Sequence, residues 1–281
     1  MDILTRDRMG LPPDPWSGLE IGTADAARVA VLVGAAATTG AMVWVLGPRG
    51  VGKTRAVREA LRRTEPPLVE PLRLDRENLH LGDIQAAIVR DLSDETPRRS
   101  GEARSGQVRR ILGAQRRTPV LFIDEAHALH HATVRGLKRL RELSWQGRSP
   151  LIGVVLAGQR DAAARIAEVA LRSDRVTMAG PTREEASRAL LGALNGRRQV
   201  ITPEAAARLV DDDRARTWLD LQDLADECMA RAVARGAETV DESVAGAVLA
   251  PPSVRTARRA GRANGAAPSD EAVAARLAGA A

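Results

Sequence analysis

Residues 47–54 read Gly47-Pro48-Arg49-Gly50-Val51-Gly52-Lys53-Thr54. This stretch matches G-x-x-x-x-G-K-[ST], the pattern of a phosphate-binding P-loop. The apolar run Ala41–Leu46 before it predicts a buried strand, and Arg55–Arg63 after it has a helical pattern. Because strand, loop and helix follow one another in the order that a P-loop requires, a chance glycine-rich turn is a poor explanation.

The residue types in this loop predict which ligands it binds. Glycines let successive backbone N–H groups point at phosphate oxygens, and the helix N-terminus adds partial positive charge. Lys53 is expected to reach the β- and γ-phosphates, and the Thr54 hydroxyl to bind Mg²⁺. We therefore expect ATP and Mg²⁺ as cofactors, with Gly47 through Thr54 and the adjoining Arg55 around the nucleotide.

A second motif is an apolar strand that ends in two acids, Pro119-Val120-Leu121-Phe122-Ile123-Asp124-Glu125. Asp124 is expected to hold magnesium through water, and Glu125 to polarise the attacking water as a general base. The alternative is a strand that simply ends in solvated acids. Together with the P-loop, the pair indicates an ATPase with a catalytic glutamate rather than a simple nucleotide kinase.

The elements around these motifs alternate. Helices are predicted over Asp25–Ala37, Ala132–Trp145 and Asp161–Leu171, and strands over Val69–Leu74 and Leu151–Ala157. Gln159 follows the last of these strands and is expected beside the γ-phosphate. Alternation of this kind, with motifs at strand ends, predicts an α/β fold with a parallel, doubly wound sheet.

The pattern changes at Gly180-Pro181. Thr182–Glu185 is a capping box, and Thr202-Pro203 has the residues that favour a helix start. Further helices are predicted over Trp218–Ala234 and Asp241–Leu249. We therefore expect four parts: an N-terminal extension over 1–20, an α/β nucleotide-binding core over 21–180, a small all-helical lid over 181–250, and a disordered basic tail over 251–281.

Composition excludes several classes of protein. The 281 residues are 44% hydrophobic with a single cysteine, Cys228, which argues against a disordered chain or a disulfide scaffold. The chain does not open with a secretory signal, so a cytoplasmic location is expected. The uncharged run Val29–Leu46 is near the length of a membrane span, but Gly34 and Thr38–Gly40 interrupt it. No membrane association is expected.

Two other interpretations of the segment around Asp124-Glu125-Ala126-His127 are rejected. The tetrad spells the motif of DEAH-box helicases, but the chain is too short for their two domains. His127, His130 and His131 do not form a metal-binding pattern with cysteines or carboxylates, so solvated loop histidines are the better interpretation.

Arginine dominates the basic residues, since only Lys53 and Lys138 among 42 are lysines, and the net charge is +6. One dense arginine cluster contains a single acid, Glu102, and comprises Arg98, Arg99, Arg104, Arg109, Arg110, Arg116 and Arg117. Such a cluster is suited to neutralising phosphates of double-stranded DNA without reading sequence. The alternative is arginine on solvated helix faces in an arginine-biased chain, and both interpretations stay open.

These motifs, with Leu156–Gln159, Leu171–Val176 and Pro181–Glu185, resemble the AAA+ ATPases of the ExeA/TniB group. That group includes phage Mu transposition protein B and target-selecting ATPases of transposons. The resemblance covers roughly residues 20–250. It implies a P-loop core with a parallel five-stranded sheet and a helical lid. It also implies a homo-oligomer, a ring or a helical filament, with ATP between subunits.

The resemblance carries three residue roles. Gln159 falls on the first sensor position, and Arg172 or Arg175 falls where an arginine finger reaches the neighbour's γ-phosphate. The alternative for both arginines is a pair with Asp174 or with solvent. Relatives place a sensor arginine before the helix that starts at Trp218. Here Arg216 either substitutes for it or the sensor is missing.

The function expected from this resemblance is an ATPase that oligomerises on DNA and regulates transposition through target capture and transposase activation. One alternative is an ExeA-like ATPase of secretion or envelope assembly. Another is a nucleotide-gated signalling or scaffold module with little hydrolysis, against which the intact Glu125 counts.

Overall fold

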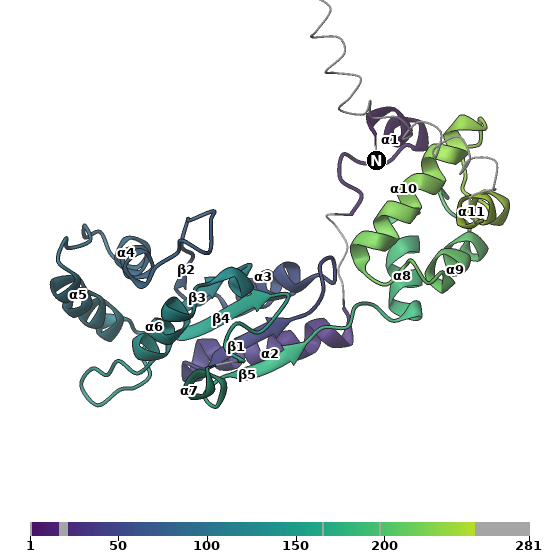
Figure 1. Cartoon of the computed structure of the whole chain (residues 1–281). Helices are drawn as coiled ribbons and strands as arrows, with labels where there is room; N and C mark the ends of the chain where they lie inside the picture. Colours follow the sequence, from purple (N-terminus) through teal and green to yellow (C-terminus); the bar gives the residue numbers. More distant parts are fainter. Residues whose placement is uncertain (1, 17–21, 165, 197, 251–281) are drawn as a thin grey trace, which may run out of the picture.

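The computed structural model describes residues 2–16, 22–164, 166–196 and 198–250. Its centre is one sheet in which every strand pairing is parallel, with the strand order β2-β3-β4-β1-β5 (Figure 1). The strands are β1 (Met42–Leu46), β2 (Leu68–Val69), β3 (Val120–Ile123), β4 (Gly153–Gly158) and β5 (Asp174–Thr177). The predicted α/β fold with a five-stranded parallel sheet is confirmed.

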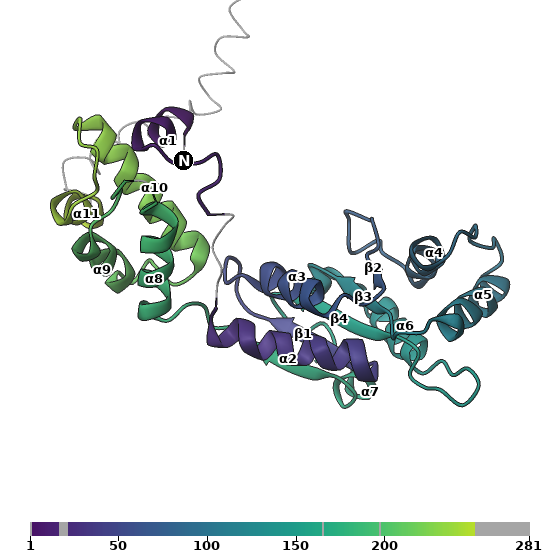
Figure 2. The same cartoon turned by 180° about the vertical axis from the view of Figure 1, so that it is seen from behind.

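Helices cover both faces of this sheet. One face carries α2 (Ala24–Thr39) and α3 (Lys53–Thr64), which are seen best from behind in Figure 2. The other carries α4 (Leu81–Leu92), α5 (Gly101–Ala114), the 3₁₀ turn η1 (Ala126–Ala128), α6 (His131–Arg141) and α7 (Ala167–Ala170).

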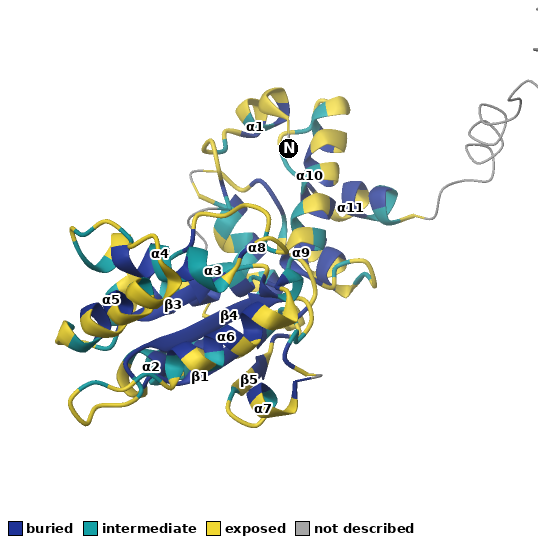
Figure 3. Ribbon diagram, turned by 60° about the vertical axis from the view of Figure 1, so that its left-hand side comes forward, coloured by how far each residue is buried: buried dark blue, intermediate teal, exposed yellow. Residues whose placement is uncertain are grey.

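Successive residues of each central strand face opposite layers. In β1, Met42 and Trp44 belong to the core under α4, α5 and α6, whereas Val43 and Val45 belong to the core under α2 and α3. Because both faces are buried, the strands read as unbroken apolar runs in the sequence. Figure 3 shows them as the most deeply buried part of the molecule.

The later helices pack around a separate apolar core. They are α8 (Arg183–Leu194), α9 (Pro203–Asp211), α10 (Trp218–Ala234) and α11 (Glu242–Leu249). The predicted capping box is present, since the Thr182 hydroxyl accepts from the Glu185 N–H and Glu185 accepts from the Thr182 N–H. Thr217 and Asp220 form a second box at the start of α10.

The N-terminal segment lies on this helical part. α1 (Ile3–Met9) contacts α10, and Met9 is buried within the helical core. Trp16 packs against the same core, while its carbonyl accepts a hydrogen bond of 3.0 Å from Arg55 on α3. Residues 2–16 therefore bridge the helical part and the P-loop helix. Residues 17–20 of the predicted extension, and the predicted tail over 251–281, lie outside the described residues.

Three predicted elements are shorter in the structure. The strand expected over Val69–Leu74 is limited to Leu68–Val69, because Pro71 cannot donate to the ladder. The helix expected over Asp161–Leu171 is limited to α7, because the Asp161 carboxylate accepts from the Ala163 N–H and so favours a turn. The helix expected over Ala132–Trp145 ends at Arg141.

Among the described residues, no helix combines the length and the apolarity that a bilayer crossing demands. The uncharged run singled out in the sequence divides into α2, a turn at Gly40 and β1.

Candidate functional site

The P-loop connects β1 to α3 and curls around the start of the helix. Gly50 and Gly52 have φ angles of 84° and 91°, a left-handed conformation that residues other than glycine rarely adopt. Lys53 is only 7% exposed. Its Nζ donates to the carbonyl oxygens of Gly47 at 2.9 Å and Pro48 at 2.7 Å. The ammonium group is thus held inside the loop that the sequence assigned to phosphate.

The environment of Lys53 lowers the pKa of its ammonium group. Burial is the main cause, because it disfavours the charged form, and the nearby carboxylates of Glu125 and Asp124 oppose it. The lysine of the first motif therefore faces both acids of the second.

Thr54 joins the two motifs directly, although Thr54 and Asp124 are 70 positions apart. The Thr54 hydroxyl donates to Oδ2 of Asp124 at 2.7 Å. The other carboxylate oxygen of Asp124 accepts from the Glu125 N–H at 2.9 Å. A hydroxyl and a carboxylate side by side form a set of hard oxygen ligands, which is what Mg²⁺ prefers. These residues fit the expected metal.

Glu125 follows directly with an exposed carboxylate. Its φ angle of 52° lies in the left-handed region, which is unusual for a residue other than glycine and turns the chain sharply after β3. Its side chain is 57% exposed, and its Oε2 lies 3.3 Å from Nδ1 of His127. A carboxylate with access to solvent beside a nucleotide site can accept a proton from water.

The three histidines of this region differ. His130 and His131 are exposed, as expected, but they lie at the start of α6 rather than in a loop, with ring centroids 4.0 Å apart. The same interpretation is wrong for His127, whose side chain is 17% exposed because η1 packs against the end of β4. No group of three or more metal-ligating side chains occurs among the described residues.

Gln159 lies at the tip of β4, between the ends of β3 and β1 in the sheet. Its backbone N–H is 3.4 Å from Nδ1 of His127, and its side chain is exposed. The residue therefore occupies the same edge of the sheet as Asp124 and Glu125, where the sequence predicted it.

The two predicted finger arginines are both ion-paired within the chain. Arg172 pairs with Glu142 at the end of α6. Arg175 donates to Oδ2 of Asp161 at 2.6 Å and to the carbonyl oxygens of Ala170 and Ser173. The alternative partner expected from the sequence, Asp174, is not the one used by either. A finger role requires that one of these pairs opens.

Arg216 lies immediately before α10, at the point where the helical part touches the P-loop. A Cβ at Gly50 would come within 2.7 Å of the Thr217 hydroxyl, and a Cβ at Gly180 within 2.7 Å of the Arg216 carbonyl oxygen. The Arg216 guanidinium itself donates to the Asp213 carbonyl at 2.8 Å. The close contact of Arg216 near the P-loop is therefore made by its backbone carbonyl oxygen and not by its guanidinium group.

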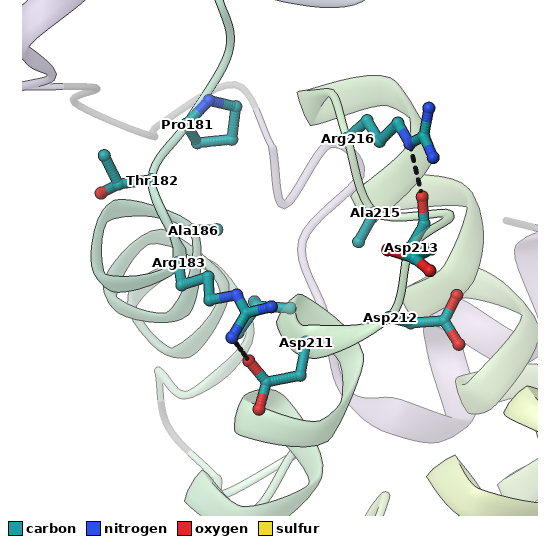
Figure 4. Close-up of a pocket in the computed structure, with 10 residues that line it drawn as sticks. Pro181, Thr182, Arg183, Ala186, Asp211, Asp212, Asp213, Ala215 and Arg216 are labelled. Carbon is teal, nitrogen blue, oxygen red and sulfur yellow. Dashed lines mark hydrogen bonds and ion pairs between the residues drawn. The ribbon is translucent and has the colours of Figure 1, made fainter.

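Arg216 also borders a hollow of about 160 Å³ between α8 and the segment after α9. Figure 4 shows Arg183 reaching across it to Asp211, with 2.9 Å between the charged atoms. The lining is mostly polar, including Asp212 and Asp213, and the hollow belongs to the helical part rather than to the sheet edge.

The arginine cluster divides into two groups. Arg104 donates to three backbone carbonyl oxygens, Arg109 donates to the Ser144 carbonyl beside the Trp145 ring, and Arg110 pairs with Glu95 at 2.7 Å. The hydrogen bond from Arg110 lowers the pKa of the Glu95 carboxyl. These three fasten α5 to its surroundings. Arg117 likewise donates to the Thr64 carbonyl oxygen. In the second group, Arg98 and Arg99 at the turn before α5 and Arg116 after it are exposed, and their side chains form no hydrogen bond or ion pair with the described residues.

Sequence reasoning missed the contact between His127 and Glu125 and every arginine partner in this region. The spacing of His127, two residues after Glu125, was visible in the sequence. The 3₁₀ turn that brings its ring back to the carboxylate was not.

The sheet order, the loop after β1 and the acids after β3 together define a P-loop AAA fold. In agreement with this class, a family model described as an AAA domain matches residues 37–166.

Solved structures show the same fold at low sequence identity. The chain is similar to the RuvB Holliday junction branch migration motor of Thermotoga maritima, with a TM-score of 0.56 and 18% identity over 80% of this chain and 67% of that one. It is similar to Cdc6p of Pyrobaculum aerophilum, with a TM-score of 0.60 and 18% identity over 83% and 68%.

A third structure, Drosophila ORC bound to DNA, has a TM-score of 0.58 and 17% identity over 88% of this chain and 64% of that one. A search of curated protein sequences finds no match. At these identities the likenesses establish the fold.

Proposed function

We propose that the chain is a Mg²⁺-dependent ATPase that assembles on double-stranded DNA and regulates transposition. The main support for ATPase activity is the hydrogen bond between Thr54 and Asp124, because it joins the phosphate loop to the acidic end of β3. A glycine-rich loop alone, or a strand that ends in acids alone, occurs in many proteins. When a P-loop and such a strand end are in hydrogen-bond contact, they form a site for a nucleotide and its metal.

Each residue then has a role. Residues Gly47–Thr54 surround the phosphates with their backbone N–H groups, which all of them except Pro48 possess, and Arg55 adjoins them at the start of the helix. Lys53 exchanges its carbonyl partners for β- and γ-phosphate oxygens. Thr54 and Asp124 hold Mg²⁺, which when bound neutralises phosphate charge. Glu125 orients a water and accepts its proton as the water attacks the γ-phosphate.

The remaining roles rest on the resemblance described above. Gln159 is proposed to sense the γ-phosphate from the tip of β4, and Arg216 to sense the nucleotide from the helical lid. Arg172 or Arg175 is proposed to leave its ion pair and reach the ATP of a neighbouring subunit in a ring or filament. Such a cation would neutralise charge in the transition state.

DNA binding is supported by the exposed Arg98 and Arg99 and by the roles of proteins with similar structures. One of these is a branch migration motor for Holliday junctions, and another is bound to DNA. We propose that ATP-bound oligomers of the cytoplasmic protein hold target DNA and activate a transposase, and that hydrolysis resets them.

The test is the steady-state rate of ATP hydrolysis with and without duplex DNA, together with electron microscopy of the ATP-bound protein on DNA. We expect turnover that DNA stimulates and assemblies that require ATP. Glu125→Gln should lower kcat by about 100-fold or more while ATP still binds. Turnover indifferent to DNA would favour the role in secretion, and binding without turnover would favour a signalling module.

The transposase partner needs its own measurement. In a strand-transfer assay with a candidate transposase, ATP and wild-type protein should increase the yield and Lys53→Ala should not. An equal yield with the wild type and with Lys53→Ala would contradict the transposition role, but it would not contradict the ATPase assignment.

A further inference from the structure

One imidazole nitrogen lies between two groups at the catalytic edge of the sheet. Nδ1 of His127 lies 3.3 Å from Oε2 of Glu125 and accepts a hydrogen bond of 3.4 Å from the Gln159 N–H. The first group belongs to the end of β3 and the second to the tip of β4. The two histidines at the start of α6, His130 and His131, are exposed and do not share this position.

The fold holds the ring in place. Ala126, the first residue of η1, is fully buried, and η1 packs against β4. The close approach depends on Gly158, where a Cβ would lie 2.9 Å from the His127 backbone N and 3.2 Å from the His127 Cβ. With only 17% of its side chain exposed, His127 has little freedom to leave the gap.

Glu125, by contrast, has few restraints. Its side chain is 57% exposed, and among the described residues His127 is the one side chain within ion-pair or hydrogen-bond distance of its carboxylate. A general base must be oriented toward its water, because a displacement of about 1 Å can lower a rate by as much as 100-fold. The contact with His127 is the described restraint on that orientation.

The two contacts of Nδ1 exclude each other in the neutral ring. A neutral imidazole carries its proton on one nitrogen only, so Nδ1 is either a donor or an acceptor. With the proton on Nδ1, the ring donates to Glu125. With the proton on Nε2, Nδ1 accepts from the Gln159 N–H, which is the hydrogen bond found in the structure, and Glu125 is released.

We propose that His127 is the positioning residue of Glu125: its Nδ1–H holds the carboxylate in the orientation that accepts the water's proton. The hydrogen bond that Nδ1 accepts from the Gln159 N–H in the structure competes with this contact, and it makes the orientation of Glu125 responsive to the tip of β4. The inference rests on the proposed ATPase function, and it assigns His127 no contact with the nucleotide.

The first test compares substitutions of His127 whose side chains imitate either Nδ1 or Nε2 of the imidazole ring. In His127→Asn the new side chain keeps a polar amide group near the place of Nδ1, whereas in His127→Gln the amide reaches toward that of Nε2. We therefore expect His127→Ala and His127→Gln to lower kcat by about 10-fold or more with KM changed less than about twofold. His127→Asn should recover most of the rate, and His131→Ala should match the wild type.

Equal rates for His127→Ala and wild type would overturn the proposal. So would equal losses in the alanine, glutamine and asparagine variants, because a general disturbance of packing does not distinguish the two nitrogens. Melting temperatures of all four variants identify any loss that arises from unfolding.

The second test needs no turnover. With only four histidines in the chain, ¹⁵N-labelled histidine gives a resolvable long-range ¹H–¹⁵N spectrum. At a mildly alkaline pH the His127 ring of the wild type should carry its proton on Nδ1, and Glu125→Ala should move it to Nε2. Glu102→Ala, which removes a carboxylate on α5, should leave the spectrum unchanged.

A His127 spectrum that Glu125→Ala does not alter would show that the contact is absent, whatever the ATPase rate. If the wild type does not hydrolyse ATP, the proposed function fails and the spectrum alone decides the role of His127.

Discussion

Lys53 and Lys138 are the two lysines of the chain, and they provide a matched pair of substitutions. Lys53 lies inside the P-loop, whereas Lys138 on α6 is 3.3 Å from Glu168. Lys53→Ala should weaken ATP binding by about 10-fold or more, because the phosphates lose a partly desolvated cation. Lys138→Ala should bind ATP as the wild type does. Fluorescence titration with a labelled ATP analogue measures both.

Lys53→Arg refines this prediction. The charge is retained, but a planar guanidinium does not fit the space of a compact ammonium. We expect this variant to resemble Lys53→Ala, and wild-type affinity in it would contradict the role of shape.

Cys228 on α10 is fully buried, and burial raises the pKa of its thiol to about 12. Because the thiolate is the reactive form, the native protein should scarcely react with a thiol reagent at mildly alkaline pH. Labelling should become fast only when denaturant unfolds the helical core. A stoichiometric reaction of the native protein within seconds would show that this core opens readily.

At the scale of elements, α2 and β4 approach each other unusually closely. A Cβ at Gly153 would lie 2.1 Å from the Ala36 carbonyl oxygen, which is a backbone atom and cannot move aside. Gly153→Ala should therefore lower the free energy of unfolding by about 1–3 kcal/mol, as overpacking does. Chemical denaturation monitored by circular dichroism measures the change.

Gly106→Ala on α5 is the matched control. Nothing lies within 4 Å of a Cβ at this position. Alanine in a helix interior is favoured over glycine by about 0.5–1 kcal/mol, so the control should be as stable as the wild type or more so. If both variants lost stability equally, the close contact at Gly153 would not be the cause.

The sequence predicted most elements but not all of their lengths. The central strands were recognisable as apolar runs, and α8, α9 and α10 as helices, the first two with caps at Thr182 and Thr202. β2 and α7 were predicted too long. In both, a local feature (Pro71 after β2 or the carboxylate of Asp161 before α7) shortens the element, while the surrounding apolar pattern continues.

At the scale of the whole molecule, the arginine cluster separates into side chains that bind groups of this chain and side chains, such as those of Arg98 and Arg99, that form no hydrogen bond or ion pair with the described residues. Replacing Arg98 and Arg99 together by alanine should weaken binding to duplex DNA. It should also reduce the slope of log K against log salt by about 2, since two phosphate contacts would be lost. The double variant Arg90→Ala and Arg188→Ala removes the same charge from exposed positions on α4 and α8 and should change the slope less.

Arg104→Ala should behave differently. It removes hydrogen bonds to three carbonyl oxygens around the start of α5, so a lower melting temperature is expected. An unchanged melting temperature together with lost DNA binding would instead assign Arg104 to the DNA surface.

The sequence by itself determined the α/β class, the P-loop and the acidic strand end. Each of these depends on a short run of residues whose backbone geometry and hydrogen-bonding needs are local. The same holds for the helix caps at Thr182 and Thr202.

Only the tertiary structure decided what the long and polar side chains contact. The Thr54 hydroxyl meets Asp124, His127 meets Glu125, and Arg172 and Arg175 meet acids other than Asp174. The physical reason is that these partners come from different strands and helices. Their distances are set by the parallel sheet order and by close backbone contacts such as that at Gly158, which no local pattern specifies.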